Sequence, residues 1–212
     1  MSNNQRYSKT TYLVLCGLFA ALMAICSYIT IPLPFTPVPI NLGTLGVFLA
    51  GGILGRKYGS VCVAVYILMG AVGIPVFSGF QGGLNVLVGP TGGYIIGYLA
   101  AAFTIGAIID SYLKKNSMSA LPSGADASDD TPDKTAATGG STSKKRIFII
   151  CACSMTAGLV VCYILGTVWF MILMDTSLWA SLVACVFPFI PGDIIKIAAG
   201  SLLVGKLRPL IF

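Results

Sequence analysis

The chain has 212 residues, of which 56% are hydrophobic and 9% are charged, and its mean hydropathy is +0.90. A soluble domain carries roughly 25% charged residues, so this composition excludes a soluble globular protein. The net charge is +6, and the lack of any histidine argues against a zinc or haem site. Apolar runs too long for barrel strands must hydrogen-bond their own backbone in a bilayer, so the fold class is an all-α integral membrane protein.

Six apolar segments predict six transmembrane helices that form a single membrane domain. Their approximate ranges are 11–31, 40–55, 59–77, 91–110, 147–173 and 178–205, so that four helices lie within 11–110 and two within 147–208 of the chain 1–212. The first segment follows two basic residues, but it is longer than the roughly 15 residues of the apolar part of a signal peptide. We therefore expect it to remain as the first helix.

The segment 116–143 separates the two groups of helices. It consists mainly of small and polar residues and has almost nothing to bury, which predicts a disordered cytoplasmic linker. A tolerated insertion explains such a linker, and a regulatory role stays open.

The basic residues gather at one side of the predicted bundle. Of the 13 Lys and Arg residues, 12 precede the first segment, follow the sixth, or lie in the connections between segments two and three and between four and five. By the positive-inside rule, we expect a multi-pass protein of the plasma membrane with both termini in the cytoplasm. This topology explains the positive charge without a nucleic-acid partner.

The connections on the opposite side are rich in Pro and Gly but remain apolar. They are residues 31–41 (IPLPFTPVPIN) and 73–93 (GIPVFSGFQGGLNVLVGPTGG). Apolar backbone that is not helical is tolerated at membrane depth when it packs on protein or lines a cavity. Because the second, fourth and sixth helices begin here with the positive ends of their dipoles, the sequence predicts an outward-facing pocket able to hold an anion.

Two ionisable residues, Asp193 and Lys196, lie well inside the last apolar segment. Ionisable residues in a membrane segment are functional candidates by default. Residues three apart share a helix face, so the pair either binds a ligand or only neutralises itself. Pro188 and Pro191 predict a break ahead of the pair, with residues 178–187 as a short separate helix.

Uncharged polar residues in the segment 73–93 are further candidates. Asn85 and Gln81 carry amides that are able to bind either a ligand or the loop backbone. Thr91 precedes two glycines, and we expect it to cap the following helix.

The first apolar segment carries a stripe of small residues, Ala20 and Ala24, with Gly17 and Ala21 nearby. Such a stripe lets another helix approach closely. That helix belongs either to this chain or to a partner.

The sequence offers no machinery for catalysis. The spacing of Gly200, Gly205 and Lys206 mimics a phosphate-binding loop, but Leu207 replaces the required Ser or Thr and no strand precedes the stretch. No set of nucleophile, base and orienting residue is visible either. We therefore expect no enzyme, and any ATP hydrolysis must come from another protein.

Three stretches together resemble a known family. They are PFTPVPI (34–40), GIPVFSG with GGLNVLVGPTGGY (73–94) and PFIPGDIIKI (188–197). These stretches are similar to the biotin-specific S components, called BioY, of energy-coupling-factor (ECF) transporters. The resemblance implies a six-helix S-component bundle that captures biotin with high affinity and docks on a transmembrane T subunit, which works with two ATP-binding subunits.

The resemblance also implies roles for individual residues. Asp193 and Asn85 suit the ureido ring of biotin and Lys196 suits its carboxylate, although the opposite orientation stays open. Ala20 and Ala24 are similar to the contact that the family makes with the T subunit. The expected substrate-binding residues are Asp193, Lys196, Asn85, Tyr94, Phe35, Phe77, Phe80 and Thr91, of which the aromatic residues wall the bicyclic ring.

The chain departs from the family pattern at one informative place. Many relatives read ITLQTL where residues 40–45 of this chain read INLGTL. A glutamine is therefore lost at Gly43, together with any polar contact from that position. An S component for another vitamin and a stand-alone vitamin transporter remain the alternative functions.

Overall fold

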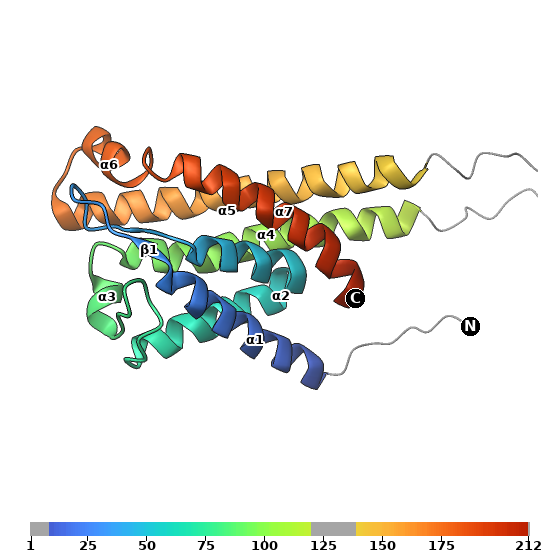
Figure 1. Cartoon of the computed structure of the whole chain (residues 1–212), viewed down its shortest axis with the longest axis horizontal. Helices are drawn as coiled ribbons and strands as arrows, with labels where there is room; N and C mark the ends of the chain where they lie inside the picture. Colours follow the sequence, from blue (N-terminus) through green and yellow to red (C-terminus); the bar gives the residue numbers. More distant parts are fainter. Residues whose placement is uncertain (1–8, 120–138, 212) are drawn as a thin grey trace, which may run out of the picture.

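The computed structural model describes residues 9–119 and 139–211. In chain order these residues form α1 (Lys9–Tyr28), β1 (Thr30–Ile31), β2 (Ile40–Asn41), α2 (Gly43–Ala71), α3 (Leu84–Val88), α4 (Gly92–Ser119), α5 (Gly139–Met174), α6 (Leu178–Cys185) and α7 (Ile190–Ile211) (Figure 1). The predicted all-helical membrane class is confirmed, since the two short strands only close the loop between α1 and α2.

The helix α2 turns back on itself at Gly55. This residue has φ 76° and ψ −173°, a conformation that a residue with a Cβ rarely adopts. The ribbon of α2 reverses its direction there (Figure 1), and the halves before and after Gly55 are so close that a Cβ on Gly59 would lie 2.8 Å from the Ala50 carbonyl oxygen. The bend matches the predicted boundary between the segments 40–55 and 59–77. The second half of α2 ends at Ala71, before the predicted end at residue 77, and Val72 and Gly73 begin a loop.

Four helices in the described part of the chain are long and apolar enough to cross a bilayer, namely α1, α2, α4 and α5. The pair α6 and α7 passes the same test together and is bent by 54° at a short break. The break lies between Cys185 and Ile190, where Pro188 cannot continue a helix and Pro191 fits the first turn of the next one. The predicted interruption before Asp193 is therefore confirmed.

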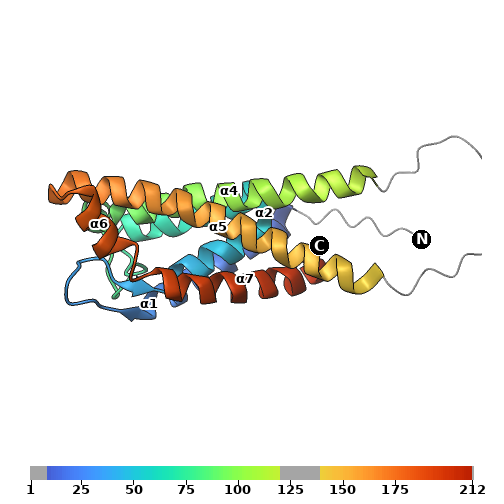
Figure 2. The ribbon, with the colours of Figure 1, turned by 90° about the horizontal axis from the view of Figure 1, so that it is seen from above.

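The helix α4 lies at the centre of the bundle, with α2 on one side and α5 on the other. Small residues let these helices approach closely. A Cβ on Gly51 of α2 would lie 2.8 Å from the carbonyl oxygen of Ala102 in α4, and one on Gly97 of α4 would lie 3.2 Å from the Cα of Cys162 in α5. The helix α1 packs on α2, and α7 packs on α5 and α2 (Figure 2).

The two ends of the bundle differ in kind. The start of α1, the end of α4, the start of α5 and the end of α7 lie at one end, while α3, α6 and the β1–β2 loop lie at the other (Figure 1). The helices α4 and α5 include both ends of the predicted linker 116–143, and its central part, residues 120–138, lies outside the described residues.

Candidate ligand-binding site

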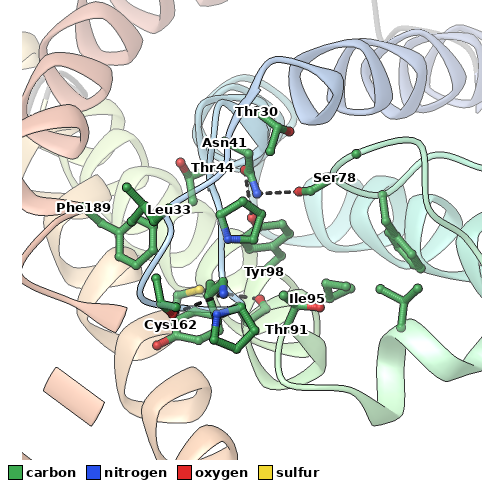
Figure 3. Close-up of a pocket in the computed structure, with 18 of the residues that line it drawn as sticks. Thr30, Leu33, Asn41, Thr44, Ser78, Thr91, Ile95, Tyr98, Cys162 and Phe189 are labelled. Carbon is green, nitrogen blue, oxygen red and sulfur yellow. Dashed lines mark hydrogen bonds between the residues drawn. The ribbon is translucent and has the colours of Figure 1, made fainter. Parts of the chain in front are cut away.

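A cavity of about 290 Å³ lies at the end of the bundle that holds the β1–β2 loop (Figure 3). It is enclosed by that loop, the start of α2, the loop after α2, the starts of α4 and α7, and the end of α5. Both Pro- and Gly-rich segments contribute to its wall, as the sequence predicts. Antiparallel pairing of Thr30 with Asn41 and of Ile31 with Ile40 holds the ends of the first segment together.

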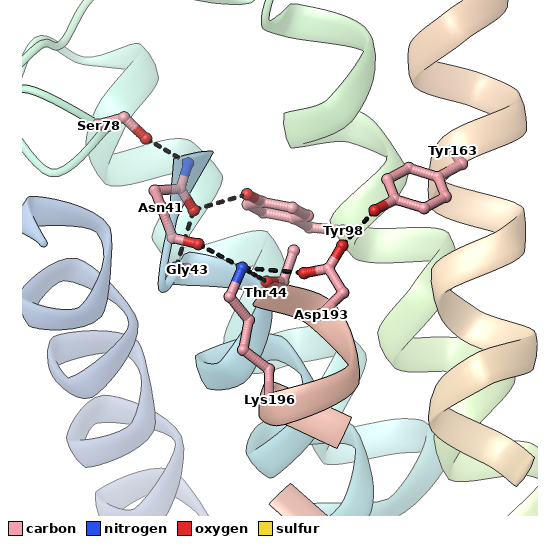
Figure 4. A network of polar contacts seen from close by, with 8 residues as sticks. All are labelled: Asn41, Gly43, Thr44, Ser78, Tyr98, Tyr163, Asp193 and Lys196. Atoms are coloured by element: carbon pink, nitrogen blue, oxygen red, sulfur yellow. Dashed lines mark hydrogen bonds and ion pairs between the residues drawn. The ribbon is translucent and has the colours of Figure 1, made fainter. Parts of the chain in front are cut away.

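Asp193 and Lys196 form an ion pair in the wall of this cavity (Figure 4). They are 3% and 8% exposed, and Lys196 Nζ lies 2.9 Å from Asp193 Oδ1. Lys196 Nζ also donates to the Asn41 carbonyl oxygen at 2.7 Å and to Thr44 Oγ1 at 3.1 Å. The hydroxyl of Tyr163 donates to the other carboxylate oxygen of Asp193.

These contacts determine which donors, acceptors and net charge the pair offers to a ligand. An ammonium group has three N–H donors, and Lys196 uses all three within the protein. Lys196 thus has no unused hydrogen for the carboxylate contact that the sequence suggests. The Asp193 oxygens keep further lone pairs, and Asp193 lies in the first turn of α7, where the helix dipole is favourable to an acidic side chain. The pair is therefore neutral as a unit but rich in acceptors.

Asn41 joins this network, and the sequence did not single it out. Its Nδ2 donates to Ser78 Oγ at 2.6 Å, while its Oδ1 accepts from the Gly43 N–H at 2.8 Å and from the Tyr98 hydroxyl at 3.3 Å. The second hydrogen of Nδ2 has no partner among the described residues, and Asn41 lines the cavity. The hydrogen bond to Ser78 ties the two Pro- and Gly-rich segments to each other.

The position of the Asn41 side chain explains why a glycine fits at position 43. A Cβ on Gly43 would lie 2.9 Å from Asn41 Oδ1 and 2.8 Å from Ser27 Oγ. The Asn41 side chain thus occupies the space that a side chain at position 43 would need. Asn41 provides an amide two residues before Gly43, and its place in the stretch INLGTL is the signal that sequence reasoning missed.

Aromatic side chains wall the cavity, although not all the predicted ones do. Phe77 and Tyr94 line it as expected, and both are buried. Phe35 and Phe80 are exposed and lie outside the lining, so this structure does not bring these two predicted residues to the cavity. Phe80 instead stacks on Tyr28 with ring centroids 4.3 Å apart. The structure adds other aromatic residues to the wall, namely Tyr66, Tyr98, Tyr163 and Phe189.

The uncharged polar candidates also divide into residues that line the cavity and a residue that does not. Asn85 lies in the short helix α3, is exposed and does not line the cavity. Gln81 and Thr91 do line it. The Thr91 carbonyl accepts from the Tyr94 and Ile95 N–H groups, whereas its hydroxyl makes no hydrogen bond within the described residues. The expected side-chain cap is therefore absent there, and the Thr91 hydroxyl is available to a ligand.

The small residues on α1 divide between a buried side and an exposed side of the helix. Ala20 is 2% exposed and belongs to the core of this chain, so it cannot lie on an open partner surface. The inner side of α1 packs on α2, where a Cβ on Gly46 would lie 2.8 Å from Met23. Ala24 is half-buried, and the small residues that face outward are Gly17 and Ala21.

The chemistry of the cavity suits a small ligand with an apolar ring and a neutral polar edge. Aromatic rings supply apolar contact area, while Asp193, Asn41 and Thr91 supply acceptors and donors. Among the described residues, no group of three or more His, Cys, Asp or Glu side chains is placed to hold a metal ion. The fold and the cavity define a polytopic membrane protein whose helices enclose a site for a small organic ligand.

Comparison with known proteins places this class more narrowly. The model of the BioY family matches residues 1–211, and the chain belongs to the BioY family. It is 34% identical to the biotin transporter BioY of Rhodobacter capsulatus over 208 residues, which cover 92% of this chain and 93% of that protein. It is 30% identical to the biotin transporter BioY of Lactococcus lactis over 209 residues, which cover 98% and 94%.

A shorter match and a solved structure agree with this assignment. The chain is 49% identical to the biotin transporter BioY of Thermotoga maritima over 98 residues, which cover 46% of this chain and 57% of that protein. A crystal structure of the S-component for biotin from an ECF-type ABC transporter matches with a TM-score of 0.72 and 30% identity, over 99% of this chain and 95% of that one.

Proposed function

We infer that this chain is a biotin-binding S component, which captures biotin for uptake across the plasma membrane together with an ECF T subunit and two ATP-binding subunits. Membership of the BioY family over residues 1–211 supports this function, as does the likeness to the S-component for biotin. The observation that carries it is the cluster of Asp193, Lys196 and Asn41 in the wall of an aromatic cavity.

We place the ureido ring of biotin against this cluster. The ring offers two N–H donors and one carbonyl acceptor and carries no charge. The Asp193 carboxylate has lone pairs for the N–H groups, and the free hydrogen of Asn41 Nδ2 suits the carbonyl. Lys196 donates to the Asp193 carboxylate and to the Asn41 carbonyl oxygen, and so holds both groups in place. A neutral ring meets a neutral cluster here, which avoids the cost of burying an unpaired charge.

The carboxylate of biotin then points away from the Asp193–Lys196 pair. Among the described residues that line the cavity, the cationic one is Lys196. Its three N–H donors already bind Asn41, Thr44 and Asp193. Thr91 offers a hydroxyl without a protein partner, and it directly precedes α4. The positive end of a helix dipole favours an anion within the first turn. We therefore assign the carboxylate to Thr91 and the start of α4, with Phe77 and Tyr94 along the apolar rings.

We propose six membrane-crossing segments, with both halves of α2 counted separately and α6 with α7 counted as one. Both termini then lie in the cytoplasm. The distribution of Lys and Arg supports this orientation, and it turns the cavity toward the outside, where a capture subunit meets its ligand. A cysteine placed within residues 120–138 tests it, and labelling of that cysteine in whole cells by a reagent that cannot cross membranes would contradict it.

We assign the T-subunit contact to the outward face of α1, where Gly17 and Ala21 are exposed. Small residues let a partner helix approach closely. Ala21→Leu should weaken co-purification with a T subunit and leave biotin binding unchanged. The matched variant Ala20→Leu should destabilise the isolated chain by about 1 to 3 kcal/mol because it overpacks the core. Equal co-purification by Ala21→Leu and the wild type would contradict this contact.

Equilibrium binding of biotin to the purified protein in detergent tests the function itself. We expect saturable binding of one biotin per chain, without competition from an excess of thiamine or riboflavin. Binding of another vitamin but not of biotin would replace the assignment. Uptake of biotin into proteoliposomes that hold this chain alone would favour the stand-alone alternative, whereas uptake that requires the T subunit, the ATP-binding subunits and ATP supports the S-component role.

A further inference from the structure

A second cavity lies at the opposite end of the bundle. It has a volume of about 340 Å³ and lies between the end of α4, the start of α5 and the end of α7. Aliphatic side chains form most of its wall, among them Leu113, Ile147 and Ile150. Among the described residues that line it, the charged one is Arg208.

A layer of packed side chains separates this cavity from the biotin site. Ile105 of α4, Met155 of α5 and Ser201 of α7 are fully buried between the two lining sets. The Ser201 hydroxyl donates to Met155 Sδ at 3.5 Å, which ties α7 to α5 in this layer. The second cavity is therefore not a continuation of the biotin site, and it needs an occupant of its own.

Exposed cations lie on all three helices near this cavity. Three lining residues, one on each helix, stand next in sequence to an exposed cation. The pairs are Leu113 with Lys114, Ile147 with Arg146, and Gly205 with Lys206. Among the described residues, Asp110 is the acid at this end, and it is already paired with Arg208. This end of the three helices is thus positively charged, while the wall of the cavity is mostly apolar.

Arg208 retains donors beyond its contacts within the protein. Its Nη1 donates to the Gly52 carbonyl oxygen at 2.7 Å, and its Nη2 donates to Asp110 Oδ1 at 2.7 Å. A guanidinium has five N–H donors in a fixed fork, so further donors remain. This fork matches the oxygens of a phosphate group. An apolar chamber beside it matches a hydrocarbon chain.

We propose that this cavity binds one anionic phospholipid from the leaflet that surrounds the basic helix ends. One acyl chain lies between α4, α5 and α7, and the phosphate lies at Arg208. Basic pockets between transmembrane helices at the cytoplasmic leaflet are suited to anionic headgroups, and this is the cytoplasmic leaflet in the orientation proposed above. The lipid site does not depend on the identity of the vitamin.

Native mass spectrometry of the full-length protein tests the lipid site. The protein is freed of lipid in detergent and offered phosphatidylglycerol and phosphatidylcholine with the same acyl chains. We expect one retained phosphatidylglycerol per chain, with a preference of about tenfold or more over phosphatidylcholine, because phosphatidylglycerol is a net anion whereas the choline cation of phosphatidylcholine is repelled by the cations at this end. Equal retention of the two lipids would overturn the anionic assignment, and retention of neither would overturn the site.

Two tryptophan variants locate the retained lipid. Ile150→Trp fills the chamber without removing any contact of Arg208, so it should abolish retention of phosphatidylglycerol. Ile149→Trp is the matched control, because Ile149 is exposed and does not line the cavity. Both variants should bind biotin as the wild type does, which shows that they fold. Retention by Ile150→Trp at the wild-type level, or equal loss in both variants, would mean that the lipid sits elsewhere on the surface.

A charge variant tests the headgroup contact. Arg208→Gln should lower the retention of phosphatidylglycerol and narrow its preference over phosphatidylcholine, since the guanidinium that contacts the phosphate is gone while the apolar chamber and the other cations of the three helices remain. Lys57→Gln is the control for net charge, because Lys57 lies in the bend of α2 and does not line the cavity. Retention of phosphatidylglycerol by Arg208→Gln at the wild-type level would contradict the placement of the phosphate.

Discussion

The two ends of the bundle each hold an ion pair, and the pairs differ in burial and surroundings. At the end that holds the β1–β2 loop, the side chains of Asp193 and Lys196 are 4% and 9% exposed and lie in the wall of a cavity. At the other end, where the Lys and Arg residues gather and which we call the basic end, the side chains of Asp110 and Arg208 are 42% and 18% exposed. The first pair keeps unused acceptors beside the cavity, whereas the second connects parts of the backbone.

The contacts of the second pair explain its structural purpose. Asp110 Oδ2 accepts from the Arg56 N–H at 2.8 Å, directly after the bend at Gly55, and Arg208 donates to the Gly52 carbonyl oxygen. The pair therefore holds the bend of α2 against α4 and α7. Burying an ion pair is costly and often does not stabilise a protein, so the deep pair at the other end is better explained by ligand binding than by folding.

The largest expected effect is that of Asp193→Asn. The carboxylate is the main acceptor for the ureido ring, and a charge-assisted hydrogen bond contributes about 1.5 to 3 kcal/mol, so biotin binding should weaken by about tenfold to 150-fold. The buried Lys196 also loses its partner, which should destabilise the protein by about 3 to 5 kcal/mol. Isothermal titration and thermal unfolding in the same detergent measure the two effects.

A double variant separates ligand contact from self-neutralisation. Asp193→Asn with Lys196→Met removes the unpaired charge, so stability should return while biotin binding stays weak. If the pair served only to neutralise itself, binding would recover together with stability. A folded double variant with wild-type affinity would therefore refute the assignment of the site.

At the basic end, Gly55→Ala should be the most damaging small change. Its backbone has φ 76° and ψ −173°, which costs a residue with a Cβ about 1 to 3 kcal/mol. A Cβ there would also lie 2.7 Å from Asp110 Oδ2. The melting temperature should fall, while the affinity for biotin in the folded protein should stay unchanged because the cavity lies at the other end. Gly17→Ala, which meets open space, is the control.

Much of this fold follows from the sequence. Long apolar segments and the distribution of charges predict the helices and the two unlike ends, and Pro188 with Pro191 predicts the break before Asp193. The spacing of Asp193 and Lys196 predicts their contact because residues three apart share a helix face. These features depend on local chemistry or on composition, and both can be read along the chain.

The parts that the sequence did not predict depend on contacts between distant segments. Asn41 meets Ser78 and Tyr98 only because two loops and α4 converge. Phe80 and Asn85 lie in an apolar segment, yet the turns around them direct both side chains away from the cavity. The sequence also did not predict which side of α1 faces the core, since small residues occur on both faces of this helix.

Asn41→Ala and Asn85→Ala compare an amide that lines the cavity with the amide that the sequence predicts to bind the ligand. Loss of the Nδ2 donor should weaken biotin binding by about twofold to 13-fold, as expected for a neutral hydrogen bond of about 0.5 to 1.5 kcal/mol. Asn85→Ala should change binding little, because the Asn85 side chain is exposed and does not line the cavity. A larger loss from Asn85→Ala than from Asn41→Ala would show that the segment 73–93 rearranges around the ligand and would restore Asn85 to the site.

The smallest expected effect is that of Asp110→Asn. The variant keeps one oxygen for the Arg56 N–H and loses the charge that faces Arg208, and the Asp110 side chain is 42% exposed. Exposed ion pairs contribute about 0.2 to 1 kcal/mol, so the melting temperature should fall slightly. Because salt screens exposed charges but hardly affects buried ones, the difference from the wild type should shrink in high salt for Asp110→Asn and persist for Asp193→Asn. A loss of stability in Asp110→Asn that is large and independent of salt would mean that this pair, too, acts as a buried one, and the contrast between the two ends would fail.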